Sequence, residues 1–212
     1  MTEALRVGGY EGWILTANGM RIDYENPEPS QITMVDIAHS LGNLCRFTGG
    51  TKQFYSVAQH SCFVARIVED ILKNELSFDE METAAFQDQL LAAMLHDAAE
   101  AYVNDLASPL KHIMGGRYGW IEHGLTNAIF ERYGIDTDYK NNIVKDADNI
   151  AVMHERYYLL PEHKDWPVDK SKITYGPPPY LPPSTAGNMF AEAFREMILK
   201  RNALRAEERV SG

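Results

Sequence analysis

Residues 90–102 read LLAAMLHDAAEAY, and this stretch decides the fold. Six apolar residues come first without a polar interruption, so a helix that they form is apolar on most of its sides. Such a helix belongs in the middle of a bundle, because only neighbours on every side remove it from water. We therefore predict a long central helix over residues 79–102, which carries His96 and Asp97 into the apolar interior.

The segments on both sides of this stretch predict further helices and one hairpin. Thr33, with Asp36 three residues later, and Ser56 precede apolar residues at helical spacing and are typical N-caps. Nearer the N-terminus, two strand-like runs flank Asn18-Gly19, a dipeptide that favours a tight hairpin turn. The predicted strands span 13–16 and 21–24, and the predicted helices span 33–44, 56–74, 79–102, 109–114, 120–133, 138–160 and 185–208. We therefore predict an all-α protein, a helical bundle with a small N-terminal β-hairpin.

Length and composition indicate one domain. The chain has 212 residues and a mass of 24.0 kDa, which suits a single domain with its own core. Hydrophobic residues make up 45% and charged residues 24%, so intrinsic disorder of the bulk is excluded. Within this domain we expect an N-terminal hairpin extension over 1–32, a Pro-rich surface loop over 161–184 and a C-terminal helix over 185–208.

Charge, hydropathy and cysteine content limit the partners and the location. Acidic residues outnumber basic ones by 30 to 20, and the net charge of -10 argues against a nucleic-acid partner. No apolar run approaches the length of about 20 residues that crosses a membrane, so we expect no membrane partner. The N-terminus shows no apolar leader. Cys45 and Cys62 are too far apart for a CxxC pair, so we expect free thiols in a reducing cytoplasm.

Polar residues in the apolar centre carry the chemistry. His96 and Asp97 are costly at the end of a buried helix unless they pair with each other or bind a metal. A His-Asp dipeptide that stands alone in a sequence is more often a buried pair in which the two side chains hydrogen-bond to each other. Here His60, in SVAQHS, and Asp148, in VKDAD, add a second imidazole and a second carboxylate. The four side chains form a mixed nitrogen and oxygen ligand set, and they converge if three helices pack together.

The spacing of these residues carries a resemblance to a known superfamily. The pattern H…HD…D, here His60, His96-Asp97 and Asp148, resembles the HD-domain metal-dependent phosphohydrolases. HDAAEAYVNDLASPLK, residues 96–111, is similar to the HDASE-x4-D-L-x-x-P-x-K stretch of bacterial 5′-deoxynucleotidases. CRF at 45–47, SVAQHS and VKDAD resemble the Arg-Trp, SVAEHS and VKQAD segments of that subfamily, with Phe in place of Trp. The same set also resembles the compact phage dATP triphosphohydrolases. The resemblance covers roughly residues 33–160 and implies an HD-domain bundle.

The resemblance also implies roles for the acidic residues. It implies that a divalent metal ion is bound by His60, His96, Asp97 and Asp148. Asp146, two residues earlier in the same segment, is the alternative to the last of these. Glu100 would be the general acid or base toward the attacking water. It lies four residues after His96, on the same face of the predicted helix, and could instead orient that histidine. Asp105, the second predicted catalytic residue, would lie beside the sugar and the metal-bound water, or it caps the turn before Pro109.

Phosphate binding needs positive charge in this acidic chain. Arg46, Lys111 and Lys145 each lie within one of the motif stretches and are the predicted phosphate ligands, although each could be an ordinary surface charge. Phe47 would stack on a base or sugar, or it belongs to the core.

We therefore expect a metal-dependent phosphohydrolase that acts at the 5′ α-phosphate of deoxynucleotides. Three separated cations suit more than one phosphate, so the favoured activity is a dATP triphosphohydrolase that releases deoxynucleoside and triphosphate. The alternative is a 5′-deoxynucleotidase that converts deoxynucleoside monophosphates to deoxynucleoside and phosphate. A third hypothesis is a non-catalytic sensor that binds metal or nucleotide.

The cofactor and the assembly follow from the same resemblance. The expected cofactor is a divalent ion, Co, Mn or Zn, while Mg, Ni and Fe remain open because this ligand set accepts several metals. The expected partner is the small-molecule deoxynucleotide substrate, and the resemblance implies a homo-oligomer, a dimer or larger. The location would be the host cytoplasm if the chain is encoded by a phage.

Overall fold

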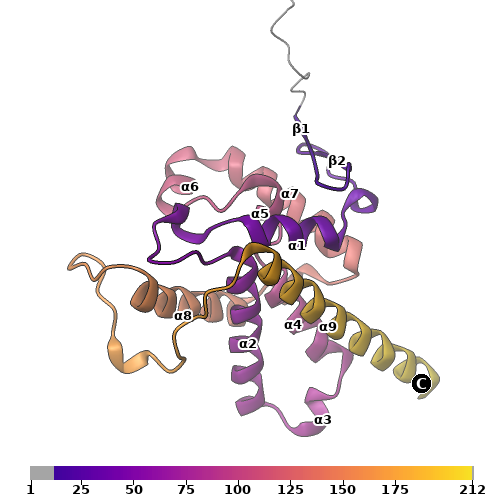
Figure 1. The fold of residues 1–212 in the computed structure, drawn as a ribbon. Helices are drawn as coiled ribbons and strands as arrows, with labels where there is room; N and C mark the ends of the chain where they lie inside the picture. The colour runs from indigo at the N-terminus through magenta and orange to yellow at the C-terminus, as the bar shows by residue number, and fades with distance from the viewer. Residues whose placement is uncertain (1–11, 212) are drawn as a thin grey trace, which may run out of the picture.

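The hairpin predicted around Asn18-Gly19 forms, and it is tied to the body of the protein. The computed structural model describes residues 12–211, beginning with this hairpin (Figure 1). Its strands are β1 (Trp13–Leu15) and β2 (Arg21–Asp23), which pair antiparallel. Gly19 has a φ of 79°, which the turn requires and glycine adopts without strain. The backbone and side-chain nitrogens of Asn18 both donate to Asp36 at 3.0 Å. Residues 1–11 of the predicted extension lie outside the described residues.

Two helices begin at the predicted caps. Helix α1 (Met34–Asn43) follows Thr33, whose hydroxyl accepts a hydrogen bond from the Asp36 backbone nitrogen. Helix α2 (Val57–Glu75) follows Ser56, which forms a reciprocal capping box with Gln59. Both starts are therefore confirmed, because they depend on side chains within three residues of the helix end.

The single central helix predicted over 79–102 was wrong, because the chain breaks it twice. The segment forms α3 (Phe78–Met81), α4 (Ala84–Met94) and α5 (Glu100–Val103). Thr83 accepts from the Phe86 backbone nitrogen and so starts a new helix. After α4, His96 Nδ1 lies 2.7 Å from the carbonyl oxygen of Ala93. Lys140 Nζ donates a hydrogen bond of 2.7 Å to the carbonyl oxygen of His96. Beyond this point the backbone nitrogens of Ala98, Glu100 and Ala101 donate to carbonyl oxygens three residues earlier, which is the pattern of tight turns and not of an α-helix.

The remaining helices match their predictions in kind and differ in their bounds. They are α6 (Ser108–Met114), α7 (Gly116–Tyr133), α8 (Asn142–Leu159) and α9 (Pro183–Ser211). Helix α7 begins four residues before the predicted start. Helix α8 begins later than predicted, because a 3-10 turn (Thr137–Tyr139) comes first and the Asn141 side chain then caps the helix. The Pro-rich connection before α9 contains one short 3-10 turn (Lys170–Lys172).

Helix α4 lies in the middle of the bundle, as its apolar sequence predicts. It packs against α2 and α9, and α9 in turn lies along α1 (Figure 1). Four consecutive residues at its end, Leu91 to Met94, are fully buried. The α1–α9 contact requires glycine, since a Cβ on Gly42 would lie 2.6 Å from the Pro183 carbonyl oxygen. The all-α fold with a small hairpin is thus confirmed.

None of the helices in the described part of the chain has both the length and the apolar character needed to cross a membrane.

Candidate metal centre

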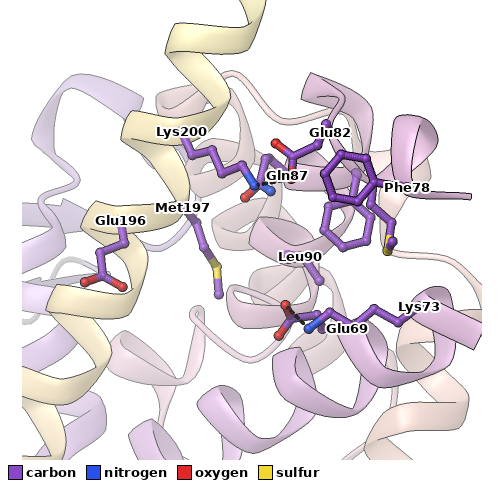
Figure 2. A pocket seen from close by; sticks show the side chains of 11 residues that line it. Glu69, Lys73, Phe78, Glu82, Gln87, Leu90, Glu196, Met197 and Lys200 are labelled. Carbon is purple, nitrogen blue, oxygen red and sulfur yellow. Dashed lines mark hydrogen bonds and ion pairs between the residues drawn. The ribbon is translucent and has the colours of Figure 1, made fainter. Parts of the chain in front are cut away.

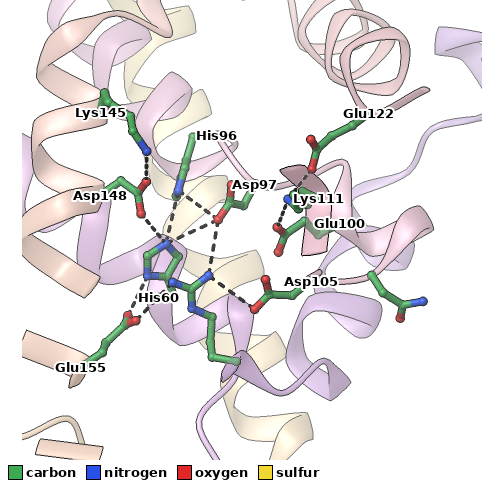
Figure 3. A network of polar contacts seen from close by, with 12 residues as sticks. His60, His96, Asp97, Glu100, Asp105, Lys111, Glu122, Lys145, Asp148 and Glu155 are labelled. Atoms are coloured by element: carbon green, nitrogen blue, oxygen red, sulfur yellow. Dashed lines mark hydrogen bonds and ion pairs between the residues drawn. The ribbon is translucent and has the colours of Figure 1, made fainter. Parts of the chain in front are cut away.

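The four predicted metal ligands come from three elements and meet at one point (Figure 3). Helix α2 supplies His60, the turn after α4 supplies His96 and Asp97, and α8 supplies Asp148. The Nε2 atoms of the two histidines lie 3.3 Å apart, and Asp148 Oδ1 lies 3.4 Å from His60 Nε2. Each of these three residues offers a ligand atom within 4.8 Å of the others. Asp97 Oδ2 completes the cluster, 3.1 Å from His96 Nε2 and 3.5 Å from His60 Nε2.

The outer ring nitrogens of both histidines are held by other groups. His60 Nδ1 lies 2.6 Å from Glu155 Oε1, and His96 Nδ1 lies 2.7 Å from the carbonyl oxygen of Ala93. A carbonyl or carboxylate at Nδ1 keeps the proton on that nitrogen and leaves the Nε2 lone pair for a metal. Both lone pairs then face the same point, beside two carboxylates. This donor set fits a divalent ion.

The electrostatics of the centre favour positive charge between the imidazoles and the carboxylates. Burial and the Arg46 guanidinium lower the pKa of His60, but Glu155 and Asp148 outweigh them and hold it well above its ordinary value. Burial raises the pKa of Asp148, but its hydrogen bond to His60 brings it far below the ordinary range. The centre therefore holds ionised carboxylates around a position that attracts positive charge. Without a metal this charge is the proton on His60 Nε2, which a bound ion would displace.

The structure decides between the two aspartates of VKDAD. Asp146 is exposed on the outer face of α8, whereas Asp148 is half-buried and reaches the histidines. The choice of Asp148 over Asp146 agrees with this placement.

Glu155 is the polar residue of the centre that the sequence analysis missed. Its side chain is 1% exposed, and it uses both oxygens, Oε1 toward His60 and Oε2 toward an Arg46 nitrogen at 3.2 Å. The signal was present, because Glu155 follows Asp148 by seven residues, two helical turns along one face of α8.

Glu100 lies at the start of α5 and faces the cavity beside the centre. Its Oε1 accepts a hydrogen bond from Lys111 Nζ at 3.1 Å, and its buried Oε2 has no hydrogen-bond partner. Burial raises the pKa of Glu100 to about 9, with the charges of Asp97 and Asp105 acting in the same direction. The predicted shared helix face with His96 was wrong, because His96 lies in the turn after α4 and Glu100 begins α5. The alternative role as the partner of His96 was also wrong, since that ring bonds to a backbone carbonyl.

Asp105 lies on the opposite side of the arginine from Glu155. Its Oδ2 is 3.5 Å from an Arg46 nitrogen. The alternative role as a helix cap was wrong, because the cap position of α6 is Ala107 and receives no side-chain hydrogen bond. Burial raises the pKa of Asp105 above its ordinary value.

Backbone strain is concentrated beside this centre. Among the described residues, the non-glycine positions with positive φ are Phe47, Thr48 and Asn104. Phe47 and Thr48 follow Arg46, and Asn104 precedes Asp105. Such conformations cost free energy in residues with a side chain and persist where the surroundings enforce them, often at functional sites.

A cavity of about 650 Å³ opens onto the centre. Besides Asp97, Glu100, Asp105 and Asp148, it is lined by all of the predicted substrate-binding residues, Arg46, Phe47, Lys111 and Lys145. Arg46 is buried, whereas the Lys145 side chain is exposed and donates to Asp148 Oδ2 at 2.9 Å. Lys111 also contacts Glu122 at 2.7 Å. Each of the three cations is therefore already paired with a carboxylate.

A second cavity, of about 490 Å³, lies between α2, α3, α4 and α9 (Figure 2). Apolar side chains such as Leu90 and Met197 line its floor, and the ion pairs Glu69–Lys73 and Glu82–Lys200 lie at its rim. None of the predicted site residues lines it.

Comparison with known proteins adds relatives without an assigned activity. No protein-family model matches this chain. It is 33% identical over 189 residues to the uncharacterized protein YfdR of Escherichia coli, across 87% of this chain and 95% of that protein. It is 31% identical over 148 residues to an uncharacterized protein of Rhodobacter capsulatus, across 68% of this chain and 70% of that protein.

Proposed function

This chain belongs to the family of the Escherichia coli protein YfdR, and for this member we propose the activity of a metal-dependent phosphohydrolase of the HD-domain type. The proposed reaction is hydrolysis at the 5′ α-phosphate of a deoxynucleotide. One observation carries the proposal: His60 and His96 direct Nε2 toward each other and toward Asp148, while other groups hold both Nδ1 atoms.

The proposed metal ligands are His60, His96 and Asp148, with Asp97 as the fourth. Two imidazoles and two carboxylates accept Co, Mn or Zn, and also Mg, Ni or Fe. When bound, such an ion supplies Lewis acidity to a phosphoryl oxygen and to the attacking water.

The other residues of the cavity would bind phosphate and move a proton. Glu100 has one oxygen held by Lys111 and one free, so Oε2 is the atom that would accept or donate the proton. Arg46 lies at the cavity wall with Nη2 held by Glu155 and Nη1 3.5 Å from Asp105, so a phosphate oxygen would bind Nη1 in place of Asp105. These two roles agree with the resemblance and with the lining of the cavity.

The number of phosphates distinguishes two candidate substrates. Three cations in the sequence favoured a triphosphate, with dATP as the specific substrate. In the structure, each of these cations already contacts a carboxylate that lines the cavity, so less positive charge is free for β- and γ-phosphates. This observation supports the second candidate substrate, a deoxynucleoside monophosphate.

Product analysis tests both candidates. The purified protein is loaded with Co, Mn or Zn and incubated with the four deoxynucleoside monophosphates and the four triphosphates. Release of triphosphate with a preference for dATP would support the triphosphohydrolase. Orthophosphate from monophosphates alone would support the 5′-deoxynucleotidase. Metal-loaded protein that yields no product from either panel would contradict both and leave the binding-only sensor.

Two variants test the site itself. Glu100→Gln should keep metal and fold but lose turnover by at least about 100-fold, because the proton-transferring carboxyl is gone. His96→Ala should lose both metal and turnover. Asp146→Asn is the matched control, because this exposed carboxylate on α8 lies outside the cluster and its loss should change neither. Full activity of His96→Ala would exclude the proposed site.

A further inference from the structure

Trp166 lies in the wall of the cavity and is held there from behind by Arg156. Trp166 belongs to the Pro-rich connection, and Arg156 belongs to α8. The arginine donates to the carbonyl oxygen of Pro161 at 2.6 Å and to that of Trp166 at 3.1 Å. Its guanidinium carbon lies 5.0 Å from the centre of the indole ring. Since Arg156 is itself 3% exposed, a buried residue fixes the position of this indole.

The indole is nevertheless 47% exposed, although a tryptophan of a folded chain has much free energy to gain from burial. It lines the cavity together with Phe47, with 6.4 Å between the ring centres and 53° between the ring planes. Phe47 in turn lies 5.5 Å from the guanidinium carbon of Arg46, which contacts Asp97 at 3.8 Å. A continuous wall therefore leads from the metal ligands through a cation to two aromatic rings.

We propose that Trp166 is a stacking platform for a planar aromatic ring, the nucleobase of a ligand whose phosphate lies at the metal centre. The phosphate end of this inference rests on the proposed function. Aromatic faces bind bases by stacking with little preference for sequence, and a cation behind the ring strengthens such contacts. The platform comes from the Pro-rich connection, outside the stretch that carries the motifs.

Kinetics with and without a base on the substrate test the platform. Trp166→Ala should raise the KM for the deoxynucleotide about tenfold. The same variant should leave the KM for the base-free sugar phosphate unchanged. Trp166→Phe should recover part of the loss, because it restores an aromatic face. Trp120→Ala removes another exposed tryptophan, on α7 and outside the cavity lining, and should change neither KM. An equal rise in both KM values for Trp166→Ala would show that the indole only shapes the loop.

A binding measurement separates this inference from the proposed reaction. In a Trp13→Phe, Trp120→Phe background, Trp166 is the only one of the three tryptophans left to fluoresce. Deoxyadenosine should quench its emission saturably in protein freed of metal, and 2-deoxyribose should not. Quenching without any turnover would refute the phosphohydrolase and support the platform. Turnover of deoxynucleotides without quenching, and with an unchanged KM in Trp166→Ala, would refute the platform and support the reaction.

Discussion

At the level of single residues, Glu155 links His60, a proposed metal ligand, to Arg46, a predicted phosphate ligand. One carboxylate oxygen holds His60 Nδ1 and the other holds Arg46, all three side chains being buried. A carboxylate can accept hydrogen bonds from both donors at once, one on each oxygen. A glutamine in the same position would point its NH₂ group at one of the two donors. The residue is thus suited to set the orientation of both.

Glu155→Gln should weaken metal binding about 10- to 100-fold, the usual effect of removing a partner that orients a ligand. The amide keeps the shape of the carboxylate, so the fold should be retained. Competition with a chromophoric chelator measures the affinity, and Asp146→Asn serves as the control on the same helix. Unchanged affinity in Glu155→Gln would mean that the carboxylate does not orient His60.

Glu100 makes the stability of the metal-free protein depend on pH. Its pKa is raised from an ordinary 4.5 to about 9, mainly by burial, so the folded state favours the protonated carboxyl. Between pH 4.5 and about 9 the folded state keeps the Glu100 proton that the unfolded state has lost, so the free energy of unfolding falls as pH rises. The stabilising contribution of Glu100 is therefore complete below pH 4.5 and lost as pH rises toward 9. Urea denaturation at pH 6 and pH 9 should show a larger loss of stability for the chelator-treated wild type than for Glu100→Gln. Equal losses in the two proteins would show that Glu100 is ionised throughout.

At the scale of elements, the contact between α1 and α9 depends on glycine at Gly42 and Gly187. A Cβ on Gly187 would lie 2.7 Å from the carbonyl oxygen of Ala38, and no flexible side chain is there to move away. The two helices can therefore approach so closely only because these positions lack side chains.

Gly42→Ala should lower the free energy of unfolding by about 1–3 kcal/mol, since the backbones must separate to admit the methyl group. In a protein of this size, that corresponds to a fall in Tm of roughly 2–12 °C. Gly124→Ala, in the middle of α7 with nothing within 4 Å of the added Cβ, is the control and should be neutral or stabilising. Calorimetry of both variants measures the difference. An unchanged Tm in Gly42→Ala would mean that the helices can separate without cost.

At the scale of the whole molecule, the proposed ion would join three elements that are far apart in the sequence. Helix α2, the turn after α4 and helix α8 each supply proposed ligands, and the two histidines alone lie 36 positions apart in the chain. The unfolded chain does not hold these ligands together, so a metal should bind the folded state in preference.

Metal should therefore raise the Tm, and the rise should grow with its concentration. At 100 times the dissociation constant, the gain is about 2.7 kcal/mol, which amounts to several degrees in a protein of this length. Thermal denaturation with Co, Mn or Zn and after chelation measures the shift. His96→Ala should show none, whereas His112→Ala, an exposed histidine of α6, should behave as the wild type. A shift retained in His96→Ala would place the metal elsewhere.

Elements that depend on near neighbours could be predicted from the amino-acid sequence alone. The caps at Thr33 and Ser56, the turn at Asn18-Gly19 and the central position of residues 90–95 were all predicted correctly. Each depends on a few consecutive residues, whose spacing is visible in one dimension. The four proposed ligand residues were selected by their spaced motif, and the structure brings their side chains together.

Contacts between segments far apart in the chain became visible only in the packed molecule. At the break after α4, Lys140 donates to the His96 carbonyl oxygen, a contact between residues 44 positions apart that no local pattern indicates. The pairing of Glu155 with Arg46 and the place of Trp166 in the cavity likewise join distant segments. Side chains of this kind find their partners only when the helices pack, so their roles follow from the fold and not from their neighbours in the sequence.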